Sequence, residues 1–290
     1  MPIRIYVDGG LFDEKTAVIP VFDRGFLYGD SVYEVTRTVG GKPVDLEPHL
    51  SRLERSAEAI MLPIMPRPVI MNALAETLSA AGNPDSYIRV IVTRGAGELG
   101  LDPDLADKPR LIIVVKPLKL PPGDLYRDGA SIAIVGVRRN LRRAVDPAVK
   151  SGNYLNNIMA FAEAKRAGAY ESIMCNAEGL VVEGSTSNIF AVKDRVIRTP
   201  ALEDGLLDGI TRRRVLQIAC DAGYALEQVH MRPDDLRLAD ELFLTSSVRG
   251  VMPVVRVDGM PVKDARPGTV TRELMALYDQ FLARVAVGTL

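Results

Sequence analysis

The most informative segment of the chain is Leu180-Val-Val-Glu183-Gly-Ser-Thr-Ser-Asn188-Ile-Phe190. Its apolar residues predict two short strands, the first ending on Glu183 and the second beginning at Asn188, with a Gly-Ser-Thr-Ser turn between them. A carboxylate at the end of a strand that reads as buried needs a partner. An arginine or a protonated ring nitrogen would serve, and Asn188 is placed to tie the turn together or to orient its neighbours. The stretch therefore predicts a polar site built on a sheet.

Strands alternate with helices on both sides of this stretch. The first 120 residues contain β-rich runs and two runs with apolar residues at helical spacing: strands at 3–7, 33–38, 87–93 and 111–116, and helices at 46–61 and 68–81. The rest contains seven strands and three helices: strands at 131–137, 171–175, 180–183, 188–193, 196–199, 241–245 and 251–257, and helices at 153–167, 210–222 and 269–285. Pro121-Pro122-Gly123 can continue neither element. We expect an α/β (α+β) protein of two lobes joined near residue 120.

The composition argues against several classes of function. With 36 basic and 37 acidic residues among 290, the net charge of −1 provides no basic surface for nucleic acid or an anionic membrane. The apolar runs fall short of the roughly 18 residues of a membrane span, and the charged start is unlike a signal peptide, so we expect a cytoplasmic protein. Two histidines are too few for a zinc site or a hydrolase triad, and we expect no metal. Cys175 and Cys220 lack CxxC spacing and read as buried free thiols.

Lys150 is the first candidate for chemistry. It follows Asp146-Pro147 and precedes Ser151-Gly152-Asn153, so it lies in a constrained segment just before a predicted helix. A lysine held in a partly desolvated cleft can lose its proton, attack an aldehyde and later move protons. A solvated surface lysine is the ordinary alternative, and the residues around it do not decide between the two.

A second group of residues fits a phosphate. Leu207-Asp208-Gly209-Ile210-Thr211 opens a helix, and the free N–H groups and positive dipole of a helix start attract anions. Gly209 lets a ligand approach the backbone, and Thr211 offers a hydroxyl. Thr245-Ser246-Ser247 follows a strand, and Arg52 lies on the 46–61 helix; both suit such a site. The alternatives are ordinary turn chemistry for the hydroxyls and a surface charge for the arginine.

Tyr87 and Arg89 alternate with Ile88 in a predicted strand, so both side chains point to the same face. A tyrosine and an arginine that share a face can receive a carboxylate. The alternative is a half-exposed edge face without a ligand.

Together, in this order, these blocks resemble the fold-type-IV (class IV) aminotransferases, which depend on pyridoxal 5′-phosphate (PLP). The resemblance runs almost end to end, and its most specific parts are the stretches 183–190, 197–199 and 207–212. It implies a two-lobed fold with PLP in the interdomain cleft: a smaller N-terminal lobe over 1–119, a linker over 120–127 and a larger PLP-binding lobe over 128–290. It also implies at least a homodimer.

Carried over residue by residue, the resemblance makes Lys150 the catalytic lysine that holds PLP as a Schiff base. Tyr154 would hydrogen-bond the phenolic oxygen, Glu183 would hold the pyridine nitrogen, and Leu207 would pack on the ring. The phosphate and its surroundings would be formed by Arg52, Gly209, Ile210, Thr211, Ser246 and Ser247. The freed lysine would take the α-proton while the ring accepts electrons, and a second keto acid would reverse the reaction, which gives ping-pong kinetics.

The block from Tyr87 to Pro103 is similar to that of branched-chain aminotransferases. The similarity implies amino transfer between an L-branched-chain amino acid and 2-oxoglutarate, with Tyr87 and Arg89 reading carboxylates and Tyr28, Tyr33 and Val248 completing the substrate site. Val248-Arg249-Gly250 departs from the small-residue turn of those enzymes, which bears on carboxylate binding or adds a charge. A D-amino-acid or (R)-amine transaminase, an aminodeoxychorismate lyase, and a PLP-binding protein without turnover remain as alternatives.

Overall fold

The computed structural model describes residues 2–289, which divide into two compact units. The first unit runs to Lys119 and also takes in Val149–Asn153 and the residues from Leu282 on; the second comprises Leu120–Ala148 and Tyr154–Phe281. The sequence prediction assigns both of these later segments to the second lobe. The first of them groups with the N-terminal unit because its backbone is hydrogen-bonded to β3 (Ser31–Val39): the Gly152 N–H donates to the Ser31 carbonyl at 2.8 Å.

The first unit is built on an antiparallel sheet of six strands in the order β2-β1-β6-β5-β3-β4. The other strands of this sheet are β1 (Arg4–Val7), β2 (Gly10–Phe12), β4 (Lys42–Pro43), β5 (Ser86–Thr93) and β6 (Arg110–Pro117). β3 is buried along nearly its whole length, which matches its run of β-branched residues and its central pairing with β5. Successive side chains of β3 point to opposite faces of the sheet, as in any strand.

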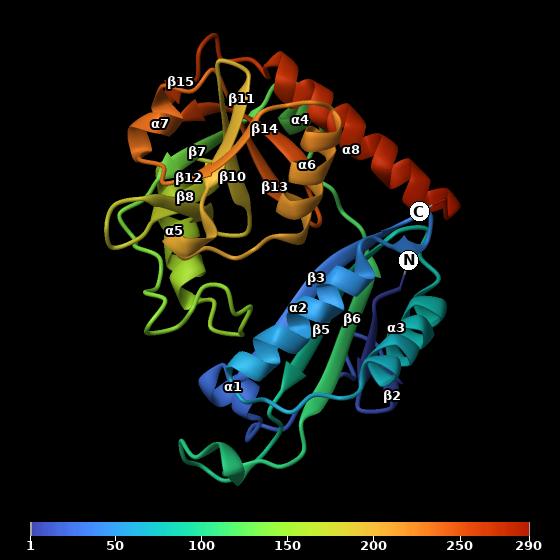
Figure 1. The fold of residues 1–290 in the computed structure, drawn as a ribbon. Helices are drawn as coiled ribbons and strands as arrows, with labels where there is room; N and C mark the ends of the chain where they lie inside the picture. The colour runs from blue at the N-terminus through green and yellow to red at the C-terminus, as the bar shows by residue number, and fades with distance from the viewer. Residues whose placement is uncertain (1, 290) are drawn as a thin grey trace. The chain divides into compact units, whose positions relative to one another are not determined.

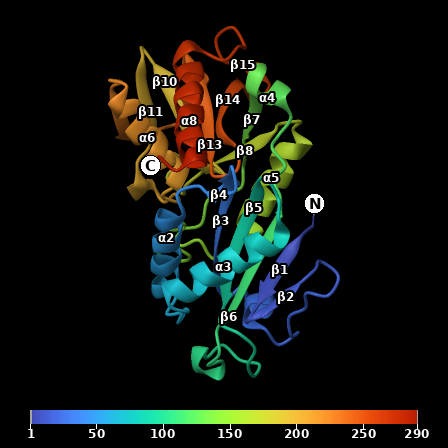
Figure 2. The same cartoon turned by 90° about the vertical axis from the view of Figure 1, so that its right-hand side faces the viewer.

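Two longer helices cover this sheet: α2 (Leu46–Ala59) packs along β3, and α3 (Arg67–Ala81) packs against β6 and β1 (Figure 2). The buried residues Leu50, Leu53 and Ala57 recur at three- and four-residue spacing on α2, as the sequence predicts. They join the strand residues in one apolar core. A five-residue helix, α1 (Arg24–Tyr28), and a 3₁₀ turn (Pro103–Leu105) complete the unit.

The second unit is built on a mixed sheet in the order β12-β11-β10-β13-β14-β7-β8-β9, with β15 paired to β14. The pairs β11–β12, β14–β7 and β7–β8 are parallel and the others antiparallel. The strands are β7 (Ala130–Ile134), β8 (Glu171–Cys175), β9 (Val181–Gly184), β10 (Asn188–Lys193), β11 (Val196–Pro200), β12 (Leu226–Val229), β13 (Glu241–Ser246), β14 (Gly250–Val257) and β15 (Met260–Pro261). β9 and β10 are the two strands that the Glu183 stretch predicts.

Three longer helices accompany this sheet: α5 (Leu155–Arg166), α6 (Ile210–Asp221) and α8 (Thr269–Val287). In Figure 1, α6 lies beside β13, and contacts between the two elements agree with this view. The short helices α4 (Gly123–Arg127) and α7 (Pro233–Arg237) have five residues each and leave no periodicity that sequence reasoning can detect. The predicted linker 120–127 therefore contains a helix, which begins directly after Pro122.

Cys175 is buried on β8, whereas Cys220 is exposed on α6, so the prediction of a buried thiol is wrong for Cys220. Cys220 lies outside the buried stripe of α6, which includes Val215 and Ala219. Within residues 2–289, no helix combines the length and the apolar character that a membrane span requires.

Candidate active site

Backbone hydrogen bonds hold Lys150 in place within the first unit. Its carbonyl accepts a hydrogen bond from the Tyr33 N–H at 3.0 Å, and its own N–H donates to Ser56 Oγ on α2 at 3.2 Å. The neighbouring Ser151 forms a β-bridge with Val32. The constrained segment that the sequence predicts around Lys150 is thus anchored to both β3 and α2.

The side chains of Lys150, Tyr33 and Arg89 come together. Lys150 Nζ lies 3.4 Å from the Tyr33 hydroxyl and 4.5 Å from the centre of its ring, and the Arg89 guanidinium carbon lies 4.0 Å from the same centre. Arg89 is paired with Val35 across β3 and β5, which puts it on the same face as Tyr33. Tyr33 is 4 % exposed, so the side chains of Lys150 and Arg89 both contact a buried aromatic ring.

The other two predicted substrate tyrosines have separate surroundings. Tyr87 shares the Arg89 face of β5, and Lys116 Nζ lies 4.7 Å from its ring centre. Tyr28 ends α1, and its hydroxyl accepts a hydrogen bond from the Gly100 N–H at 3.3 Å. The structure thus places Tyr28 against the loop that follows β5.

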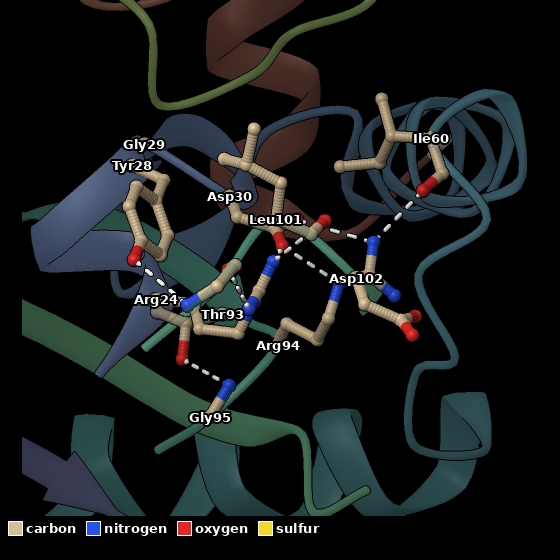
Figure 3. Close-up of polar contacts among 12 residues, drawn as sticks. Arg24, Tyr28, Gly29, Asp30, Ile60, Thr93, Arg94, Gly95, Leu101 and Asp102 are labelled. Atoms are coloured by element: carbon tan, nitrogen blue, oxygen red, sulfur yellow. Dashed lines mark hydrogen bonds and ion pairs between the residues drawn. The ribbon is translucent and has the colours of Figure 1, made fainter. Parts of the chain in front are cut away.

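That loop is held by an ionic cluster that sequence reasoning misses (Figure 3). Asp30 accepts hydrogen bonds from Arg94 at 2.7 and 3.1 Å and from Arg24 Nε at 3.1 Å. Arg24 also donates to the Gly100 carbonyl at 2.9 Å. The cluster therefore joins the end of α1, where Tyr28 lies, to the loop after β5. The sequence carries no spacing signal for it, because Asp30 and Arg94 are 64 residues apart.

Arg52 lies on α2 in a buried ionic cluster with Glu34 of β3 and His49. Its Nε and Nη2 donate to the two oxygens of Glu34 at 2.7 and 2.8 Å, and His49 Nδ1 lies 2.7 Å from Glu34 Oε2. The surface-charge alternative for Arg52 is therefore wrong. Burial alone would raise the pKa of Glu34, but the charge of Arg52 and hydrogen bonds from both partners outweigh it and lower this pKa to about 2. Burial lowers the pKa of His49 more strongly than Glu34 raises it, which favours the neutral form of this side chain.

In the second unit, Glu183 is a buried carboxylate with two partners. Arg139 Nε donates to its Oε1 at 2.8 Å, and the Leu207 N–H donates to its Oε2 at 3.1 Å. Nη1 of Arg139 is held in turn by Asn156 and Asn157 of α5. The sequence predicts an arginine as one possible partner of Glu183, but no local pattern distinguishes Arg139 from the other arginines. A ring nitrogen as a further partner stays a prediction.

The start of α6 has the features of an anion site. Gly209 occupies the N-cap position and has no side chain with which to cap the helix, and the backbone N–H groups of the first turn have no helical partner. Asn188 Nδ2 donates to the Leu207 carbonyl at 3.0 Å and fixes the loop before the helix. A Cβ on Gly209 would come within 2.0 Å of Asn188 Oδ1, so a side chain at this position would displace Asn188 or the helix start. Ile210 and Thr211 follow, both buried.

A buried hydroxyl on a neighbouring strand adds to this polar surface. Thr245 is paired with Asn188 across β13 and β10, and its Oγ1 has no hydrogen-bond partner in the described part of the chain. Such a group is costly to bury unless a ligand or water satisfies it. Ser246 follows, and its Oγ accepts a hydrogen bond from Arg249 Nε at 3.0 Å. For Ser247, Val248 and Tyr154, the predicted contacts with a ligand stay predictions.

Arg249 forms an ion pair with the buried Glu171. Its Nη2 donates to Glu171 Oε2 and to the Thr186 carbonyl, both at 3.0 Å. Glu171 also accepts hydrogen bonds from Ser185 and Ser187, so Arg249 ties the Gly-Ser-Thr-Ser turn to the turn after β13. The charge that this departure adds is thus paired with Glu171, and its effect on carboxylate binding stays a prediction.

Comparison with known proteins identifies the family of this chain. The amino-transferase class IV family profile matches residues 31–257. A Methanocaldococcus jannaschii protein assigned as a branched-chain-amino-acid aminotransferase is 38 % identical over 273 residues, which cover 94 % of each chain. The D-alanine aminotransferase of Bacillus licheniformis is 30 % identical over 286 residues, which cover 98 % of this chain and 99 % of the relative.

Among solved structures, the T.th. branched-chain amino acid aminotransferase, determined with pyridoxamine 5′-phosphate, superimposes with a TM-score of 0.92. It is 29 % identical, and the match covers 97 % of this chain and 94 % of that one. The α/β fold and the family resemblance predicted from sequence are both confirmed. The chain is therefore an enzyme that belongs to the amino-transferase class IV family.

Proposed function

We propose that this enzyme uses PLP to move amino groups between an L-branched-chain amino acid and 2-oxoglutarate by a ping-pong mechanism. The observation that carries the proposal is the placement of Lys150. Its backbone is fixed by β3 and α2, and its amine lies beside the hydroxyl of a buried tyrosine and near an arginine. A surface lysine needs none of these contacts, whereas a lysine that exchanges protons with a bound substrate needs a fixed position.

The residues present fit PLP. The second unit offers three suitable features. The first is the start of α6 at Gly209, where an added Cβ would collide with Asn188. The others are the buried hydroxyl of Thr245 and the buried carboxylate of Glu183. These three features suit an anion, a hydrogen-bonding group and a cationic ring nitrogen, respectively. The relative solved with pyridoxamine 5′-phosphate supports the same cofactor class.

When bound, PLP supplies an aldehyde that takes up amino groups and a ring that accepts electrons. Lys150 would hold the aldehyde end and then move the substrate α-proton at Nζ. Tyr33, with its hydroxyl 3.4 Å from Nζ, orients that amine. Glu183 would hold the proton on the ring nitrogen, and Tyr154 and Leu207 would orient the ring. Arg52 and the start of α6 at Gly209–Thr211, with Ser246 and Ser247, would bind the phosphate.

The substrate assignment is supported by the placement of Arg89. It stacks on Tyr33, so one face of the sheet offers both a cation for the side-chain carboxylate of glutamate and an aromatic wall for a branched aliphatic group. Tyr28, Tyr87 and Val248 would complete this recognition. The M. jannaschii relative supports the branched-chain substrate, and the B. licheniformis relative makes a D-amino acid the main competitor.

A panel of L- and D-amino acids and (R)-amines, each with 2-oxoglutarate or pyruvate as acceptor, tests the proposal. We expect L-leucine, L-isoleucine and L-valine with 2-oxoglutarate to give the highest kcat/KM. Higher values for D-alanine or an (R)-amine would replace the proposed substrates, and pyruvate release from aminodeoxychorismate would indicate a lyase. Lys150→Ala should fold, lose transamination and no longer be labelled at this position by borohydride. Wild-type rates in that variant would reject the proposed role of Lys150.

We also propose that the enzyme acts in the cytoplasm as a homodimer on small-molecule amino and keto acids. Light scattering on the purified protein distinguishes a dimer of about 63 kDa from the 31.6 kDa chain, since the dimer has twice the chain mass. A monomer that retains full activity would contradict this part of the proposal.

A further inference from the structure

Glu34 and His49 surround the arginine proposed to bind the cofactor phosphate, although the proposed function assigns neither of them a role. Glu34 follows Tyr33 on β3, so its side chain points to the opposite face of the sheet, where α2 packs. His49 and Arg52 are three residues apart on α2, and both reach the Glu34 carboxylate. None of the three residues is more than 4 % exposed.

The chemistry of the cluster fixes the orientation of Arg52. Glu34 holds the Nε–Nη2 edge of the guanidinium in a two-pronged contact, which is the geometry with the strongest directional preference. The opposite edge, with Nη1, is thereby turned away from Glu34. Because Glu34 is ionised and accepts only, we assign the His49 proton to Nδ1, from which it donates to Glu34 Oε2 at 2.7 Å. His49 thus holds the carboxylate that holds the arginine.

The same two elements also carry the contacts of Lys150. Tyr33, next to Glu34, hydrogen-bonds the Lys150 carbonyl through its N–H and contacts Nζ through its hydroxyl. Ser56, one helical turn beyond Arg52, accepts from the Lys150 N–H. Arg52 and Lys150 therefore have fixed positions relative to each other within one unit of the chain.

We propose that Glu34 and His49 are positioning residues that aim Arg52 at the cofactor phosphate, in register with Lys150. The inference rests on the proposed function, because it takes Arg52 as a phosphate ligand. A buried ion pair is a poor way to stabilise a core, since apolar side chains of the same volume often do so better. Orientation of the guanidinium is the property that an apolar replacement could not supply.

The test compares binding of PLP with binding of pyridoxal, which has the same ring and aldehyde but no phosphate. Apo protein is titrated with each compound, and bound chromophore is followed by absorbance. We expect Glu34→Gln to weaken PLP binding about tenfold or more while the Kd of pyridoxal changes less than about twofold. Glutamine fits the space but places an amide N–H against the donors of Arg52 or His49.

His49 supplies a second pair of variants in case Glu34→Gln does not fold. His49→Leu removes the donor to Glu34 and should also weaken PLP selectively, whereas His49→Asn keeps a donor near the Nδ1 position and should restore PLP binding. Glu54→Gln is the matched control, because Glu54 pairs with Arg67 on the exposed side of the same helix. That variant should bind both compounds as the wild type does.

Two results would overturn the inference. One is an equal loss of PLP and pyridoxal binding in Glu34→Gln and His49→Leu, which would indicate a merely structural cluster. The other is unchanged PLP binding in folded Glu34→Gln. Failure of the proposed function looks different: the wild type itself would then bind neither compound, or would bind PLP no better than pyridoxal.

Discussion

Glu183 is a buried carboxylate whose two oxygens both have partners in the second unit. Arg139 and the Leu207 N–H donate to its two oxygens at 2.8 and 3.1 Å, so each oxygen of this buried side chain has a partner. An ionised acid at this position is what a protonated ring nitrogen requires. Arg139 thus gives the buried acid a cationic partner within the protein.

Arg139→Gln should therefore destabilise the apo protein by about 3 kcal/mol, because it leaves a buried carboxylate without its cation. In that variant a bound ring nitrogen would supply the missing positive partner. We expect addition of PLP to raise the Tm of Arg139→Gln by more degrees than it raises that of the wild type. Thermal unfolding with and without PLP measures both effects, and equal shifts would mean that Glu183 does not meet a cationic group of the ligand.

The geometry of the loop before α6 and of its first turn depends on Gly209, because this residue has no Cβ. The Asn188 side chain donates a hydrogen bond to the Leu207 carbonyl, and its Oδ1 occupies the space that a Cβ on residue 209 would need. The helix start is consequently held close to β10, with its N–H groups directed away from the helix. Thr245, opposite Asn188 on β13, presents its buried hydroxyl beside the same residue.

Gly209→Ala should displace Asn188 or the helix start and weaken PLP binding about tenfold or more, because misplaced N–H groups bind an anion poorly. We expect a loss of about 1–3 kcal/mol in the free energy of unfolding from the same overpacking. Gly123→Ala is the control, since it opens a helix with nothing within 4 Å of the added Cβ. Titration with PLP measures the affinity of both variants, and urea unfolding measures their free energy of unfolding. Wild-type PLP affinity in Gly209→Ala would show that this helix start does not bind the ligand.

Both units contain a buried glutamate that is stabilised as the anion. Burial alone would raise the pKa of Glu171, but Arg249, Ser185 and other donors outweigh it and lower this pKa. The pKa of Glu34 falls from its ordinary 4.5 to about 2 for a similar reason. Because each folded-state pKa lies below the unfolded-state value, ionisation stabilises the fold above about pH 4.5, and this contribution is lost as the pH falls.

The free energy of unfolding should accordingly decrease between about pH 4.5 and pH 2, with Glu34 contributing on the order of 3 kcal/mol. Glu34→Gln should be less stable than the wild type at pH 7, and the difference should narrow as the pH approaches 2, where Glu34 of the wild type becomes protonated. Urea unfolding midpoints across this range provide the measurement. Two curves that stay parallel down to pH 2 would contradict the assignment to Glu34.

The local parts of this enzyme are predictable from its amino-acid sequence. The strand–turn–strand unit around Glu183, the helix start at Gly209 and the helix that carries Arg52 follow from apolar periodicity and turn residues, which act over a few positions. The order of these blocks was enough to identify the family. Even the grouping of Tyr87 with Arg89 on one face needed only the two-residue period of a strand.

Which side chains come into contact depends on the three-dimensional fold. Arg139 pairs with Glu183 from 44 residues away, Arg249 with Glu171 from 78, and Arg94 with Asp30 from 64. Such pairs depend on strand register and on the packing of a helix against a sheet, and local composition encodes neither. The segment around Lys150 joined the first unit for the same reason: hydrogen bonds to Ser31, Tyr33 and Ser56, which lie about a hundred residues earlier in the chain, determine its place.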